Sequence, residues 1–382
     1  MASPTSQVTP VDSSSVVPPI PNGNGVEQLQ QRKRSGAILT FQRGIVIIVS
    51  LAFASLAVCV VCLQFGATKI DMGAVISALS RLPDTGALDG VGGDTSSVIM
   101  VHIRLPRVLT GFLVGGSLAS VGVALQALLR NPLADPYVLG VSSGAALGVS
   151  LAMLLGIGSL VTLFPGLPLF GFAGGLLSLV VMYRLARSQG RLPIQSLLLA
   201  GVILNAMLTA LIMFITSIMD PNRSAGLMAW LMGSLTVSNY GMLSMFALYV
   251  TAGTSLLLQK AQTMNILTFG EDTARSLGVE TERVKKHLFV LAALLTGAVV
   301  SVSGMIGFVG MVVPHMVRML VGSDHRVLLP ASMLAGGMFL VVSDTIARTI
   351  LAPAEIPVGI VTALAGGPLF LYLLLWRKDQ WA

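Results

Sequence analysis

Charge is what this chain has least of: only 10% of its 382 residues are Asp, Glu, Lys or Arg, whereas 54% are hydrophobic. An ordinary soluble domain carries about a quarter charged residues, so a water-soluble fold could not hide this much apolar surface. The composition therefore predicts an all-α polytopic membrane protein. The net charge of +7 does not indicate nucleic-acid binding, because the basic residues lie in short segments between apolar runs.

The sequence also lacks the motifs of an enzyme. No lysine follows a glycine, so the phosphate-binding loop GxxxxGK[ST] is absent. The two cysteines, Cys59 and Cys62, lie within an apolar run, where we expect them to pack as small buried residues. The four histidines are scattered, and we expect structural roles for them. We therefore predict no catalytic residue, no metal site and no cofactor in this chain.

Acidic residues are almost missing from the apolar runs, and Asp344 is the one that lies inside a predicted span. It precedes Arg348 by four residues, a helical spacing that predicts an ion pair. Intramembrane carboxylates are normally functional, so an ion-coupled secondary transporter that uses Asp344 is an alternative function. Its uptake would survive ATP depletion and collapse with an uncoupler. A receptor or scaffold without transport is a further alternative, which leaves the glycine pattern unexplained.

Long apolar runs dominate the chain, and about 20 apolar residues are needed to cross a bilayer. The run from Leu288 to Val317 is too long for one span and contains Gly304, Gly307 and Gly310, so we divide it there. About ten spans result, an even number that places both termini on one side. With the termini inside, 17 of the 23 Lys and Arg residues lie in inner segments, which predicts cytoplasmic termini. The other predicted spans lie near 44–66, 105–129, 137–158, 166–183, 194–219, 241–258, 327–350 and 356–376.

Two segments flank or interrupt the spans. Residues 1–43 are rich in Ser, Pro, Asn and Gln, which predicts a disordered cytoplasmic tail ahead of a transmembrane domain at 44–377. The polar segment 265–286 contains a short amphipathic helix between Gly270 and Gly278. Such a helix is suited to docking into a groove of a partner protein, and a solvated loop is the alternative.

Small residues predict one close helix contact. Gly140, Gly144 and Gly148 are spaced four apart at the start of the third span. This spacing places small side chains on one helical face, and such a face lets two helix backbones approach each other within lipid.

Several motifs resemble the FecCD-type permeases of ABC importers, which carry ferric siderophores, haem or cobalamin into bacteria. They include RLPR at 104–107, QALLRNPLADPYVLGVSSGAALG at 126–148, GEDTARSLGV at 270–279, GFVGMVVPHMVR at 307–318 and AEIPVGIVTALAGGPLF at 354–370. The resemblance covers residues 44–376 and implies the type II ABC importer permease fold, a ten-helix subunit of the bacterial cell membrane. It also implies a permease dimer, formed with a second copy or a paralogue. The implied partners are two ATPase subunits that hold ATP and Mg, and an extracytoplasmic substrate-binding lipoprotein.

The resemblance also implies roles for particular residues. Arg104, Arg107 and Arg348 would form a positive rim at the outer mouth that receives acidic residues of the binding protein. Pro193, Ile194, Gln195 and Ser196 would lie at the cytoplasmic gate. The segment that couples to the ATPase would comprise Glu271, Asp272, Thr273, Ala274, Arg275, Leu277 and Gly278, with Ala274 and Leu277 facing the ATPase. The expected cargo is an iron chelate, haem or a ferric siderophore, with cobalamin as the alternative.

Overall fold

The computed structural model describes residues 41–66, 73, 98–157, 166–188, 190–235 and 239–376. The expected tail at 1–43 lies almost wholly outside these residues, and so does residue 377. Every regular element in the described part is a helix, as the composition predicts for an all-α membrane protein.

Seven of the described helices are long and apolar enough to cross a membrane, and three shorter helices are also apolar. Together they agree with the ten or so spans predicted from the apolar runs. The seven are α2 (Phe41–Gln64), α5 (Leu105–Leu129, which continues a π-helical turn at Met100–Arg104), α7 (Gly166–Ala186), α8 (Ile194–Ile218), α10 (Tyr240–Gln259), α13 (Thr281–Ser303) and α15 (His325–Thr349). The three shorter helices are α6 (Val141–Leu154), α14 (Val309–Val321) and α16 (Val358–Trp376). Shorter connecting elements are η3 (Pro136–Leu139), α9 (Pro221–Leu231), α11 (Ala261–Leu267) and α12 (Glu271–Ser276).

Helix α5 lies at the centre of this bundle, in contact with α15, α13, α14 and α10. Its glycines explain how the neighbouring helices come so close. A side chain on Gly115 would collide with the carbonyl oxygen of Gly336 in α15, and one on Gly122 would collide with that of Gly310 in α14. Backbones in direct contact gain packing energy that apolar burial alone cannot supply within lipid.

The apolar run from Leu288 to Val317 is divided where its glycines predicted a break. Helix α13 ends at Ser303 and α14 begins at Val309. Gly304 follows α13 with a φ of 67°, a backbone conformation that a glycine adopts without steric cost. The break turns the chain back through the bundle.

The third predicted span is shorter than the sequence indicated. Its expected range was 137–158, but α6 begins at Val141 because Gly140 has a left-handed φ of 71° and separates η3 from the helix. The preceding turn at Pro136–Leu139 adds length to this short element.

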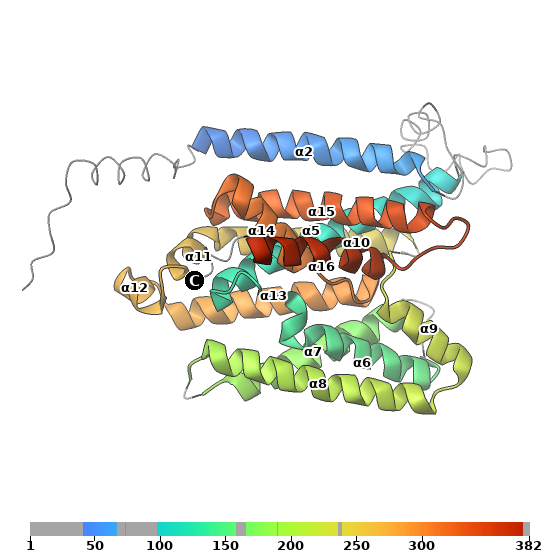
Figure 1. The fold of residues 1–382 in the computed structure, drawn as a ribbon. Coiled ribbons are helices and arrows are strands. Elements are labelled where there is room, and N and C mark those ends of the chain that lie inside the picture. The colour runs from blue at the N-terminus through green and yellow to red at the C-terminus, as the bar shows by residue number, and fades with distance from the viewer. Residues whose placement is uncertain are drawn as a thin grey trace, which may run out of the picture. The chain divides into compact units, whose positions relative to one another are not determined.

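The outer helices expose apolar side chains. Helix α2 lies along α15 on one side of the bundle, and α8 lies along α6 and α7 on another (Figure 1). Phe53 of α2 and Leu211, Met213 and Phe214 of α8 are exposed, as side chains that face lipid are. Helices α2, α13 and α15 begin at the end of the bundle that carries α12, which we call the α12 end (Figure 1). The opposite end, where Arg107 and Arg348 lie, is called the Arg107 end.

Candidate functional site

The segment that the sequence singled out for partner docking forms two short helices at the α12 end. Helix α11 packs against α15 and α5, and α12 packs against α11 and α13. Gly278, which has a φ of 81°, donates its N–H to the carbonyl of Arg275, and Val279 donates to that of Ala274 at 3.0 Å. A glycine in the left-handed conformation closes a helix in this way. The glycine-bracketed helix in the sequence therefore corresponds to α12.

The side chains of this segment correct one part of the sequence interpretation. Ala274 is completely buried in the main hydrophobic core of this chain, so the prediction that it faces the ATPase is wrong. The apolar side chains that remain open are Leu277, at 63% exposure, and Phe269, at 74%. A helix of six residues has one narrow apolar face, and here the chain's own core takes up that face.

Charged residues join α12 to the start of α13. Lys285 is only 4% exposed, and its ammonium group lies 3.1 Å from Glu271 of α12 and 2.7 Å from Glu282. Arg275 of α12 lies near both carboxylates, at 3.5 Å and 3.8 Å. A buried ammonium group surrounded by two carboxylates is held much more firmly than a surface ion pair.

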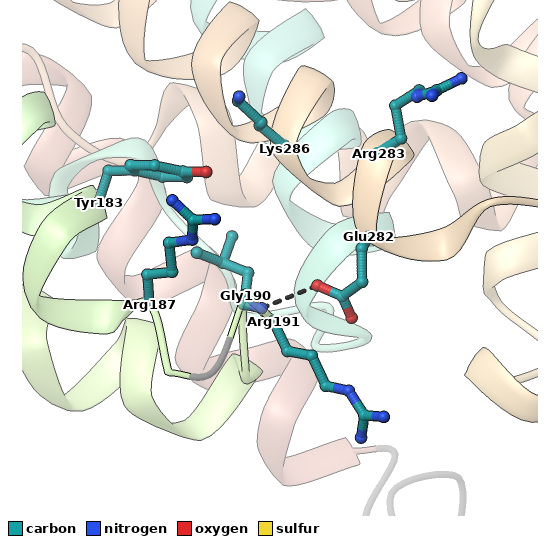
Figure 2. A pocket seen from close by; sticks show the side chains of 8 residues that line it. Tyr183, Arg187, Gly190, Arg191, Glu282, Arg283 and Lys286 are labelled. Carbon is teal, nitrogen blue, oxygen red and sulfur yellow. Dashed lines mark hydrogen bonds between the residues drawn. The ribbon is translucent and has the colours of Figure 1, made fainter.

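The same cluster holds the backbone that precedes α8. Lys285 donates to the carbonyl oxygen of Leu192 at 3.1 Å, and the N–H of Leu192 donates to Glu282 at 2.8 Å. The dashed line in Figure 2 marks the bond to Glu282. We call Glu271, Glu282, Lys285 and Leu192 the Lys285 cluster. Its contacts connect α12, α13 and the α7–α8 loop.

The predicted gate segment begins one residue after this cluster. Pro193 has an extended backbone and precedes the first turn of α8, which contains Ile194, Gln195 and Ser196. A cavity of about 250 Å³ opens beside the loop (Figure 2). Its lining is mainly basic, and the ammonium group of Lys286 lies 5.7 Å from the ring centre of Tyr183. The gate role itself stays a prediction.

A second charged cluster lies at the Arg107 end. Asp344 is buried, and both Arg107 and Arg348 contact it at 3.0 Å. The predicted pair of Asp344 and Arg348 is therefore confirmed. Arg107 also contacts Glu355 at 2.9 Å. Arg104 donates to the carbonyl oxygens of Leu63 and Gln64 in the last turn of α2.

These contacts correct the expectation of an exposed positive rim. The side chains of Arg104, Arg107 and Arg348 are largely buried, and each is engaged by acceptors of the same chain. Sequence reasoning missed Glu355, although its position in the loop before α16 placed a carboxylate at the same end. Whether a binding protein docks at this end stays a prediction.

The glycines at the start of the third span do not share one role. A side chain on Gly144 would lie 2.7 Å from the carbonyl oxygen of Gly174 in α7, and one on Gly148 would collide with that of Phe170. Both glycines therefore lie where α6 and α7 touch. Gly140 instead precedes α6, and its carbonyl accepts a hydrogen bond from Ser178 at 2.8 Å.

Metal-ligating residues do not gather in the described part of the chain. No group of three or more His, Cys, Asp or Glu side chains there could hold a metal ion, and Cys59 and Cys62 are free thiols. What the described residues provide is a helical bundle with a charged cluster at each end.

A bundle of apolar helices with a short polar helical segment at one end is the architecture of a multi-pass membrane protein. The FecCD transport family matches residues 52–376, so the chain belongs to this family. Proteins of this family are the permease subunits of ABC importers, which work with an ATPase and a binding protein.

Individual relatives are similar over most of the chain. The cobalamin import system permease protein BtuC of Halobacterium salinarum is 45% identical over 75% of this chain and 75% of its own length. The hemin transport system permease protein HmuU of Yersinia pestis is 41% identical over 81% of this chain and 91% of its own. A solved metal-chelate type ABC transporter in an inward-facing conformation matches with a TM-score of 0.73 and 32% identity, covering 87% of this chain and 99% of that one.

Proposed function

We propose that this chain is the permease subunit of an importer for an iron chelate, either haem or a ferric siderophore, and that it works as a homodimer. Cargo would arrive on an extracytoplasmic binding protein at the Arg107 end. The hemin permease of Yersinia pestis and the metal-chelate transporter support this cargo class. The cobalamin permease of Halobacterium salinarum supports cobalamin as the second candidate.

The α12 end is assigned to the cytoplasm and to the ATPase. Most of the described Lys and Arg residues lie in segments at this end, and a cytoplasmic excess of Lys and Arg sets the orientation of membrane proteins. Phe269 and Leu277 offer exposed apolar side chains beside α12, as a helix that docks into a partner groove requires. ATP and Mg would be held by the ATPase. Both termini would then be cytoplasmic.

The single observation that carries the mechanism is the Lys285 cluster. When the ATPase closes on ATP, it would displace α12, and Glu271 would carry this movement to Lys285. Lys285 and Glu282 hold both backbone groups of Leu192, so the start of α8 would move with them. The chain would thereby alternate between two states whose populations the ATPase changes.

Asp344 argues against the ion-coupled alternative. A carboxylate that carries protons or sodium ions must lose and regain its partner ion, whereas Asp344 is buried between two arginines. An ion pair of this kind is expensive to break.

Reconstitution tests the proposal. Proteoliposomes that contain this permease, its ATPase and its binding protein should accumulate haem or a ferric siderophore only with internal ATP. Cyanocobalamin serves as the competing cargo, and an uncoupler serves as the control for ion coupling. Uptake of cyanocobalamin but of neither iron chelate would show that cobalamin is the cargo. Uptake that persists without ATP would contradict the importer mechanism.

A further inference from the structure

A second cavity at the α12 end, of about 270 Å³, has a lining that none of the roles above explains. It lies where α5 and α14 end and α15 begins, beside the last turn of α11. Its polar lining consists of Gln126, Arg130, Asn131, Thr268, Arg318, Ser323 and His325.

Two cations line the cavity without an anion. Among the described residues, neither Arg130 nor Arg318 forms an ion pair or a side-chain hydrogen bond. The carboxylate nearest in sequence to Arg130 is that of Asp135, which accepts from the N–H of Tyr137 at 2.8 Å. The one nearest to Arg318 is that of Asp324, which is already engaged by Arg326 at 3.1 Å and Asn265 at 2.8 Å. Burial acts to raise the pKa of Asp324, but these hydrogen bonds outweigh it and lower the pKa to about 2. Asp324 is therefore ionised and already occupied by its own partners.

The backbone of Arg130 determines where its side chain leaves α5. Arg130 ends α5 in the left-handed region, with a φ of 49°. Helices commonly end on a residue in this conformation. The conformation holds the guanidinium at the mouth of the cavity, where Arg130 is exposed.

Two buried polar atoms line the same cavity without a partner in the described part of the chain. Gln126 is 4% exposed and donates its amide N–H to the carbonyl of Met311, which leaves Oε1 unpaired. His325 is 2% exposed, and its Nε2 is unpaired. Its Nδ1 lies 2.7 Å from Oδ1 of Asn265, an acceptor, so Nδ1 carries the hydrogen. Buried polar atoms are nearly always hydrogen-bonded, so these two atoms indicate that something polar occupies the cavity.

We propose that this cavity is a receptor for one carboxylate, supplied by an acidic side chain of the ATPase partner. The guanidinium groups of Arg130 and Arg318 donate charge-assisted hydrogen bonds to the carboxylate. With its hydrogen on Nδ1, the imidazole of His325 presents Nε2 as an acceptor, so Nε2 of His325 and Oε1 of Gln126 each accept from a water bound beside the carboxylate. This inference rests on the proposed function, because it assigns the ATPase to the α12 end.

The position of the mouth identifies the occupant. Thr268 directly precedes the exposed Phe269, and a side chain on Gly270, at the start of α12, would lie 3.8 Å from the guanidinium of Arg130. The cavity mouth therefore adjoins the apolar side chains assigned to the ATPase. An acidic side chain of the ATPase can enter the cavity while apolar neighbours cover Phe269 and Leu277.

Charge removal at the two arginines tests the proposal. Arg130→Gln and Arg318→Gln should each weaken binding of the ATPase to the purified permease by about tenfold or more, because each leaves the entering carboxylate with half of its cationic partners. Arg187→Gln is the matched control, since Arg187 is exposed at the same end but lines the other cavity. Its affinity should equal that of the wild type. The melting temperature of each variant, measured without phosphate, shows whether the variant is folded. If Arg318→Gln melts at a lower temperature than the wild type, the binding test uses Arg130→Gln, whose side chain lies at the mouth of the cavity.

Inorganic phosphate provides the second arm as a probe of the cavity. At constant ionic strength it should raise the melting temperature of the isolated wild-type permease and of Arg187→Gln, but not of Arg318→Gln. It should also compete with the ATPase. Unchanged ATPase affinity in both cavity variants would overturn the proposal, and phosphate stabilisation in that case would assign the cavity to a free anion. If the wild type binds no ATPase, the proposed function fails, and the phosphate arm alone then decides whether the cavity receives oxyanions.

Discussion

At the scale of single residues, the most deeply buried charges of the described chain are paired with one another. Asp344 lies between Arg107 and Arg348 at one end, and Lys285 lies between Glu271 and Glu282 at the other. Ionised groups that leave water are tolerated only when they are paired and hydrogen-bonded. Loss of one partner would therefore leave a buried charge unpaired and lower the stability of the fold.

Asp344→Asn should lower stability strongly, because it leaves two buried guanidinium groups facing an amide. Breaking a buried pair commonly costs about 3–5 kcal/mol. Asp220→Asn is the control, since Asp220 pairs with Arg223 at the surface and asparagine can still accept the capping hydrogen bond from the N–H of Arg223. The melting temperatures of the two variants in detergent should differ clearly. Equal melting temperatures would show that the cluster at the Arg107 end contributes little.

At the scale of helices, the sequence predicted the elements better than their contacts. The spans, the break after α13 and the short helix α12 followed from apolar runs and glycines, which act locally. The bond of Arg107 to Glu355 joins residues 248 positions apart, and that of Lys285 to Leu192 joins residues 93 apart. No local pattern reveals such contacts. For the same reason, the amphipathic pattern of α12 could not show that Ala274 faces its own core.

Two variants in and beside α12 should distinguish an effect on folding from an effect on ATPase docking. Ala274→Asp should lower the melting temperature, because it places a carboxylate in a filled apolar core, at a cost of several kcal/mol. Leu277→Asp should leave the melting temperature unchanged and weaken ATPase binding, since truncation of an interface contact commonly costs about 1–3 kcal/mol. Co-purification of the ATPase and thermal unfolding measure the two effects. A Leu277→Asp protein that recovers the ATPase as well as the wild type would remove this side chain from the interface.

The contact of α6 with α7 should not accept a large side chain. Gly144→Leu should destabilise the protein by about 1–3 kcal/mol or prevent its assembly, because the new side chain would meet Gly174 and Ser178 of α7. Gly226→Leu in α9 is the control, since a side chain there meets nothing within 4 Å. Thermal unfolding of both variants tests the prediction. A Gly144→Leu protein as stable as Gly226→Leu would show that the two helices can separate without loss.

At the scale of the whole molecule, we infer that the Lys285 cluster connects the ATPase to the path of the cargo. Within the described residues, α12 reaches the start of α8 through Glu271, Lys285 and Leu192, and also through the longer contact of Arg275 with Glu282. Coupling requires that α12 and the gate segment change state together. We therefore predict that a variant of the Lys285 cluster can still bind the ATPase but no longer couple ATP hydrolysis to cargo import.

The most direct measurement of this claim is the amount of cargo imported per ATP hydrolysed by Lys285→Met in proteoliposomes. Methionine keeps the length of the side chain and removes its charge and hydrogen bonds, whereas Lys286→Met changes the exposed neighbour and serves as the control. We predict that Lys285→Met binds the ATPase with wild-type affinity and hydrolyses ATP, but imports at least about tenfold less cargo per ATP. Lys286→Met should match the wild type. A Lys285→Met permease that keeps the wild-type ratio of cargo to ATP would contradict the account.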